Sequence, residues 1–111
     1  DYYNKAVSYL YNELGMFVIV VFSDDISWAK KNLQYKNMCF IENDPKRPAQ
    51  EDIYLMSICD SNIIANSSFS WWGAWLNQNK EKIVIAPNKW FSDSTLQEQS
   101  ENIVPETWVK L

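Results

Sequence analysis

Residues 62–76 read NIIANSSFSWWGAWL, and this stretch is the most informative about the fold. Its first four residues are mostly apolar and predict a short strand over 62–65. The polar residues 66–68 interrupt the apolar pattern and include several side chains that commonly cap helices. The following residues predict a helix over 69–77 that is apolar almost all round, which is typical of a buried helix. The stretch is therefore a strand followed at once by a helix.

The same alternation continues on both sides of this stretch. Hydrophobic periodicity predicts helices over 2–14, 26–33, 50–59 and 69–77, and strands over 17–22, 38–41, 62–65 and 82–86. Strands that alternate with helices indicate right-handed crossovers and a parallel sheet. We therefore expect an α/β fold, a Rossmann-like parallel sheet with flanking helices. The continuous apolar run 17–22 predicts a strand that is buried on both faces.

Three tryptophans stand within five residues of the stretch 62–76, and they cannot all lie on one side of a helix. We expect at least two of Trp71, Trp72 and Trp75 to lie in the core or at a domain interface. Gly73 and Ala74 are small, so we expect the helix to approach the sheet closely there.

The tail after the fourth strand is less regular. Trp90 and Phe91 are candidates to pack back on the body of the domain. Residues 92–102 are polar and predict a loop, in which a helical turn is the alternative. Residues 105–109 predict a terminal turn or a short helix.

Composition limits the class of protein. Of the 111 residues, 47% are hydrophobic and 22% are charged, which indicates one globular domain over 1–111. The net charge of −4 argues against a nucleic-acid partner, because such binding needs a basic face. There is no histidine, so the commonest general acid or base is absent. The two cysteines are far apart in sequence, which argues against a disulfide framework or a zinc site and favours a reducing, cytoplasmic setting.

Ligands of parallel sheets bind beyond the carboxyl ends of the strands, and polar residues follow two of the predicted strands. Asn66, Ser67 and Ser68 open a helix, whose first N–H groups and positive dipole suit a pyrophosphate. The alternative is that Ser67 or Ser68 only caps the helix. Asp24 and Asp25 follow the first strand, where a carboxylate can bind the two adjacent donors of guanine, a ribose diol or a metal, or can cap the next helix.

Several stretches together resemble glycosyltransferase family 11, the α-1,2-fucosyltransferases. They are IYLMSIC at 53–59, NIIANSSFSWWGAWL at 62–76, FSDDI at 22–26, IVIAP at 83–87 and KWF at 89–91. The similarity spans nearly the whole chain. One departure is Asp60-Ser61, where many relatives carry a basic residue and a histidine.

The resemblance implies the C-terminal, donor-binding domain of a GT-B fold. The whole enzyme would transfer L-fucose from GDP-fucose to the 2-hydroxyl of a terminal galactose on a glycan acceptor, with inversion and without a metal or other cofactor. Asp24 or Asp25 would bind guanine, and Ser67, Ser68 and Phe69 would bind the pyrophosphate beside Asn66. Further donor contacts would come from an N-terminal domain outside these residues, so we expect no catalytic residue here. The expected location is cytoplasmic, either free or peripheral at the inner membrane.

Three other classes compete with this interpretation. One is the donor domain of a transferase for another nucleotide sugar. Another is a receiver-like signalling domain, which also has an acidic pair after its first strand but needs an aspartate where this chain has Asn66-Ser67-Ser68. The third is a carbohydrate-binding module that uses the tryptophans, but such modules are mostly β-sheet.

Overall fold

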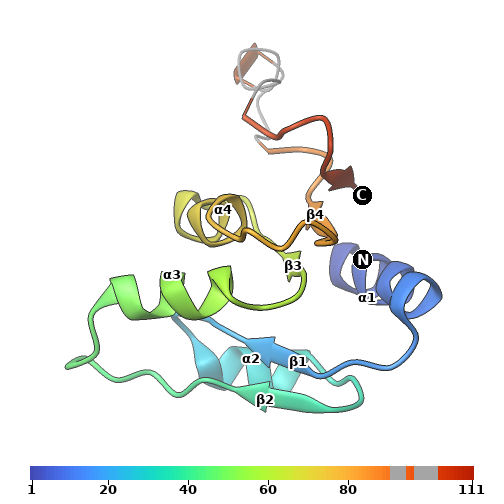
Figure 1. Ribbon diagram of the computed structural model, residues 1–111. Coiled ribbons are helices and arrows are strands. Elements are labelled where there is room, and N and C mark those ends of the chain that lie inside the picture. Colours follow the sequence, from blue (N-terminus) through green and yellow to red (C-terminus); the bar gives the residue numbers. More distant parts are fainter. Residues whose placement is uncertain (91–94, 97–102) are drawn as a thin grey trace. The chain divides into compact units, whose positions relative to one another are not determined.

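The computed structural model describes residues 1–90, 95–96 and 103–111. In chain order its elements are α1 (Tyr2–Leu14), β1 (Ile19–Val21), α2 (Ile26–Asn32), β2 (Met38–Phe40), α3 (Ala49–Ser57), β3 (Asn62–Ile63), α4 (Ser68–Trp75), β4 (Val84–Ala86) and β5 (Val109–Lys110) (Figure 1). They belong to two compact units, Val7–Pro48 and the combination of Asp1–Ala6 with Ala49–Leu111. The α/β class is confirmed.

The predicted helix over 2–14 is confirmed as α1, which ends at Gly15. Gly15 has a φ of +76°, a left-handed conformation that costs a glycine little. Its N–H donates to the Tyr11 carbonyl at 3.1 Å and so closes the last turn of the helix.

The unit Val7–Pro48 contains a strand–helix–strand crossover. β1 and β2 pair in parallel, with Ile19 opposite Met38 and Val21 opposite Phe40. α2 packs on one face of this pair (Figure 1). The apolar cluster between them consists of Ile19, Val21, Ile26, Ala29, Leu33, Met38 and Phe40.

The prediction that the first strand is buried on both faces is wrong. Val18 is 66% exposed and Val20 is 38% exposed, whereas Val21, which points to the other side, is buried. Alternate residues of a strand point to opposite faces, and α2 covers only one of them. An unbroken apolar run therefore does not by itself show that both faces are covered.

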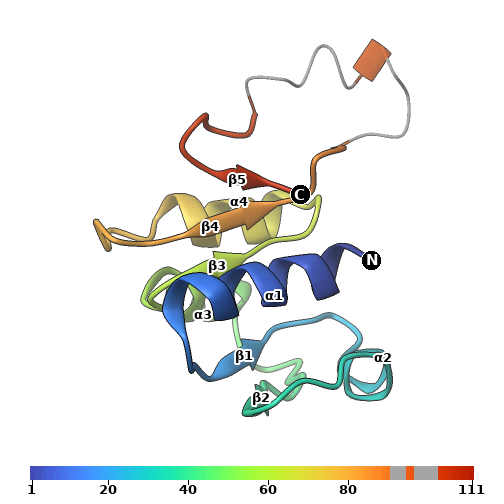
Figure 2. The same ribbon diagram turned by 90° about the vertical axis from the view of Figure 1, so that its right-hand side faces the viewer.

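The other unit holds a three-stranded parallel sheet in the order β3-β4-β5 (Figure 2). α4 packs against this sheet through Ala74, and Trp71 adds its ring to the same core. The buried residues of that core are Ile64, Ala74, Val84, Ala86, Trp90, Val104 and Trp108. Trp90 is confirmed as a core residue, whereas Phe91 and most of the predicted loop 92–102 lie outside the described residues.

Two predictions about the sheet need correction. All strand pairs are parallel as predicted, but within the described residues they form two sheets, β1-β2 and β3-β4-β5, where one sheet was expected. The alternation of strands and helices predicts that paired strands run parallel, but it does not predict which strands become neighbours. The turn expected over residues 105–109 is confirmed at its start, where the Trp108 N–H donates to the Pro105 carbonyl at 3.1 Å, but Val109 enters β5 opposite Ile85. β5 is only two residues long, and so short a strand has no visible period.

The fourth helix is not buried all round as its sequence predicts. Ser70, Gly73 and Ala74 are buried, while Trp72 and Trp75 are 47% and 51% exposed. Trp71 packs against the core, stacks on Trp75 with ring centroids 5.1 Å apart and meets Trp72 edge-on. Of the three tryptophans, one therefore reaches the core, and the expectation of at least two at a core or interface is unconfirmed.

Gly73 brings α4 close to α3, although the sequence predicted a close approach to the sheet. A Cβ atom on Gly73 would lie 2.8 Å from the Cβ atom of Met56 in α3, far inside normal contact. Ala74, the next residue, is the one that faces the sheet core. Gly73 thus allows close contact with α3, and Ala74 allows close contact with the sheet.

Buried amide side chains join the ends of α3, β3 and α4. Asn62 and Asn77 are 7% and 4% exposed. The Asn77 amide donates to the Cys59 carbonyl at 2.7 Å and to Asn62 Oδ1 at 2.8 Å, and Asn62 donates to the Met56 carbonyl at 2.8 Å. Every buried polar atom in this group has a partner, as a low-dielectric interior requires.

Candidate functional site

The turn after β1 carries the predicted acidic pair, and the structure separates the roles of its two carboxylates. Asp25 is the N-cap of α2, since its Oδ1 accepts from the Trp28 N–H at 3.1 Å. The Asp25 N–H itself donates to Ser23 Oγ at 3.0 Å. Asp24 is exposed, and its carboxylate bonds no other part of the chain that the structure describes. The capping alternative is thus confirmed for Asp25, while Asp24 keeps its full capacity to accept hydrogen bonds.

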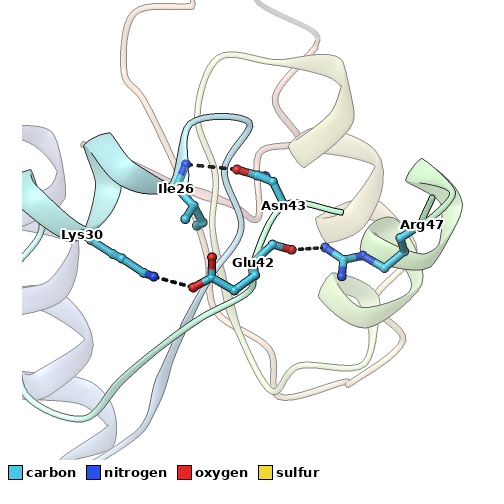
Figure 3. A network of polar contacts seen from close by, with 5 residues as sticks. All are labelled: Ile26, Lys30, Glu42, Asn43 and Arg47. Atoms are coloured by element: carbon cyan, nitrogen blue, oxygen red, sulfur yellow. Dashed lines mark hydrogen bonds and ion pairs between the residues drawn. The ribbon is translucent and has the colours of Figure 1, made fainter. Parts of the chain in front are cut away.

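The loop after β2 is hydrogen-bonded to this turn through Asn43, a residue that the sequence analysis did not select. Asn43 donates through Nδ2 to the Ser23 carbonyl at 2.6 Å. It also accepts through Oδ1 from the Ile26 N–H at 3.3 Å (Figure 3). Glu42 forms an ion pair with Lys30 of α2 in the same network. A signal was present in the sequence, because Asn43 follows the second strand much as Asp24 follows the first.

The turn after β3 carries the predicted serine-rich group. Ser67 is the N-cap of α4, and its Oγ accepts from the Ser70 N–H at 3.2 Å. Ser70 Oγ also lies 2.9 Å from Ser67 Oγ and 3.1 Å from the Ala65 carbonyl. Since a carbonyl only accepts, Ser70 donates to Ala65 and Ser67 donates to Ser70. The Ser67 hydroxyl is therefore used within the turn, as the capping alternative predicts.

The next two residues leave their polar groups free. Ser68 and Phe69 are exposed, and their N–H groups, at the start of α4, donate to no described residue. The Ser68 hydroxyl likewise has no partner within the described ranges. Unpaired N–H groups at a helix start together with the positive end of the helix dipole favour an anion there. Asn66 ties this turn to the segment after β4, since its Nδ2 donates to the Trp90 carbonyl at 3.2 Å.

The six predicted site residues thus form two groups. Asp24 and Asp25 belong to the unit Val7–Pro48, and Asn66, Ser67, Ser68 and Phe69 belong to the other unit. Within each group the residues lie on one turn at the carboxyl end of a strand. This is where ligands of parallel α/β sheets bind.

Three further observations on the described residues concern a shifted pKa, metal binding and membrane-spanning helices. Burial raises the pKa of the Tyr2 phenol, whose hydroxyl lies 2.6 Å from the Ile64 carbonyl at the end of β3. No three His, Cys, Asp or Glu side chains in the ranges 1–90, 95–96 and 103–111 lie together in a way that could hold a metal ion. Nor does any helix in these ranges have the length and apolar character needed to cross a membrane.

Comparison with known proteins identifies the class as a glycosyltransferase. The sequence model of glycosyl transferase family 11 matches residues 1–111, and the chain therefore belongs to this family. The receiver-like and carbohydrate-module alternatives are thereby set aside. No solved structure matches the chain.

Two curated relatives come from Escherichia coli. The O-antigen biosynthesis glycosyltransferase WbnK is 41% identical over 112 residues, which cover 100% of this chain and 36% of the relative. An alpha-1,2-colitosyltransferase is 43% identical over 115 residues, which cover 99% of this chain and 38% of the relative. The chain thus spans little more than a third of the length of these relatives.

Proposed function

We propose that this chain is the donor-binding domain of an inverting, metal-independent enzyme that transfers L-fucose from GDP-fucose to the 2-hydroxyl of a terminal galactose. Family membership supports sugar transfer, and the name of one relative contains the same α-1,2 linkage. The relatives are much longer, so the proposal places the galactose-terminated acceptor and further donor contacts largely on an N-terminal domain of a GT-B fold. The enzyme would act in the cytoplasm, free or peripheral at the inner membrane.

The free carboxylate of Asp24 carries the guanine part of the proposal. Guanine presents two adjacent N–H donors on its Watson–Crick edge, and a carboxylate accepts two such bonds in parallel. Hydrogen bonds to a charged acceptor are about twice as strong as neutral ones. Asp25 already spends Oδ1 on the cap of α2, so Asp24 is the better candidate of the two.

The start of α4 carries the pyrophosphate part. The N–H groups of Ser68 and Phe69 and the hydroxyl of Ser68 would donate to phosphate oxygens, while Ser67 and Asn66 hold the turn. Negative charge builds up on the departing GDP during transfer. Donors fixed in advance by the helix stabilise that charge without a metal ion. In this role the chain binds the leaving group, and its residues need not exchange protons with the reacting sugar.

A second candidate sugar is colitose, favoured by the 43% identical relative whose name contains it. The two candidates share the proposed contacts to the nucleotide and differ in the transferred sugar. An assay of the protein at the length of its relatives, with GDP-fucose or the corresponding colitose donor, would distinguish the two candidates by the sugar transferred to the acceptor.

The guanine assignment is tested by comparing Asp24→Asn with Asp25→Asn. An amide at position 24 removes the charge and half of the acceptor capacity, so we expect GDP affinity to fall at least about tenfold. Asparagine caps a helix as well as aspartate does, so Asp25→Asn should stay within about twofold of the wild type. Affinities are measured by calorimetric or NMR titration of the 111-residue chain. A larger loss in Asp25→Asn than in Asp24→Asn would contradict the assignment.

A further inference from the structure

Asn43 closes the turn that carries Asp24, although it lies on a different loop. Its one amide group bonds the Ser23 carbonyl on one side of the acidic pair. On the other side it bonds the Ile26 N–H (Figure 3). A donor and an acceptor on the same planar group are needed to make both bonds. Alanine has neither, and an ionised aspartate has no donor for the Ser23 carbonyl.

The turn depends on this bridge because Asp24 makes no contact that would fix it. Ser23 and Asp25 are bonded to groups of the turn and of α2, but the Asp24 carboxylate has no described partner. The backbone from Ser23 to Ile26 therefore sets the position from which this side chain starts. A backbone that is fixed before binding reduces the ordering cost of binding.

The loop that carries Asn43 is itself supported. Arg47 donates to the Glu42 carbonyl at 2.7 Å, and the Lys46 N–H donates to Asp44 Oδ1 at 2.9 Å. The Lys30–Glu42 ion pair joins the same loop to the last turn of α2. The residues on either side of Asn43 are thus fixed by bonds of their own. A fixed loop is needed if Asn43 is to align another loop.

We propose that Asn43 is a positioning residue for guanine recognition: it orients the Asp24 carboxylate through the backbone of the turn and does not itself need to touch the base. This inference rests on the proposed function, because it assumes that Asp24 binds the base. It adds a residue from the loop after β2 to a site otherwise assigned to the turns after β1 and β3.

Asn43→Ala and Asn43→Asp test the proposal, with Lys30→Ala as the matched control. Asn43→Ala breaks both bonds between the loop after β2 and the turn at Asp24, and Asn43→Asp breaks one of them. Lys30→Ala breaks only the ion pair between the same loop and the last turn of α2. GDP and UDP are titrated into each chain by NMR, after the spectra confirm folding. We expect Asn43→Ala, which loses both hydrogen bonds to the turn, to bind GDP about tenfold more weakly. Asn43→Asp loses only the bond to the Ser23 carbonyl, and we expect it to bind GDP at least about threefold more weakly. UDP affinity should stay within about twofold, and Lys30→Ala should keep both affinities.

The outcomes are distinct. Loss of GDP preference in the Asn43 variants alone supports the positioning role. Equal weakening of GDP and UDP would indicate a general structural effect and overturn it, as would unchanged GDP affinity in both Asn43 variants. If the wild type itself binds GDP and UDP equally, the guanine part of the proposed function fails, and the positioning role fails with it. The wild-type titration thus separates the two failures.

Discussion

Asn77→Leu lowers the free energy of unfolding by about 3 kcal/mol, because leucine cannot replace the hydrogen bonds of the buried amide. The Asn77 amide donates to the Cys59 carbonyl and to Asn62 Oδ1, and Asn77 Oδ1 accepts from the Asn79 N–H at 3.0 Å. Leucine is similar in size and would leave buried polar groups without partners. A domain of this size has roughly 5–15 kcal/mol of stability, so the loss is a large part of the total.

The neighbouring Gln78 provides the control for this change. Gln78 is exposed, and Gln78→Leu makes the same amide-to-leucine replacement without breaking a buried network. We expect it to change stability by no more than about 0.5 kcal/mol. Urea unfolding followed by tryptophan fluorescence and circular dichroism measures both. Similar losses in the two variants would show that the Asn62–Asn77 network does not stabilise the unit.

Gly73→Ala destabilises the chain by about 2 kcal/mol, although alanine is the better helix former. In an open helix position this change would stabilise by about 1 kcal/mol. Here the new Cβ atom would meet Met56 at its Cβ, Sδ and Cε atoms, between 2.8 and 3.2 Å away. Helices α3 and α4 must move apart to accept it, and overpacking of this kind commonly costs 1–3 kcal/mol.

Met56→Ala makes the Gly73 prediction specific. It removes Sδ and Cε but leaves Cβ, so Gly73→Ala should cost less in the Met56→Ala background than in the wild type. The difference is the coupling energy of a double-mutant cycle, read from urea unfolding of the four chains. A stabilising Gly73→Ala in the wild-type background would mean that α4 does not approach α3 this closely.

The sequence predicts the elements well wherever the apolar period extends over a long segment. The helix over 2–14 matches α1 at both ends, because thirteen residues give several turns of periodicity and Gly15 ends them. The strands are two or three residues long, and their predicted bounds are too wide. β5 was missed altogether, since it depends on pairing with β4, which is distant in sequence.

Burial was predicted less well than secondary structure. Trp72 and Trp75 are apolar, yet each is about half exposed. Composition alone does not show which side of an apolar helix has a neighbour. The buried pair Asn62 and Asn77 could not be found for the converse reason, because only the folded chain brings the two amides together.

For the candidate site, the sequence located the turns but not the division of roles within them. Both carboxylates at 24 and 25 were candidates, and the hydrogen bond from Trp28 assigns the cap to Asp25. Ser67 and Ser68 were likewise equivalent until the contacts of Ser70 placed the Ser67 hydroxyl inside its own turn. Asn43 follows the second strand as Asp24 follows the first, but its bond to Ser23, twenty residues away in sequence, is visible only in the folded chain.

A titration with three nucleotides tests the proposal that the turns after β1 and β3 contribute to guanine-nucleotide binding. GDP, UDP and ADP are added in turn to the isotopically labelled 111-residue chain while backbone amide shifts are followed. We expect all three nucleotides to shift the amides of residues 66–70, and GDP alone to shift those of residues 23–26. Equal shifts at residues 23–26 with all three nucleotides, or no shifts with millimolar GDP in a folded sample, would contradict the proposal.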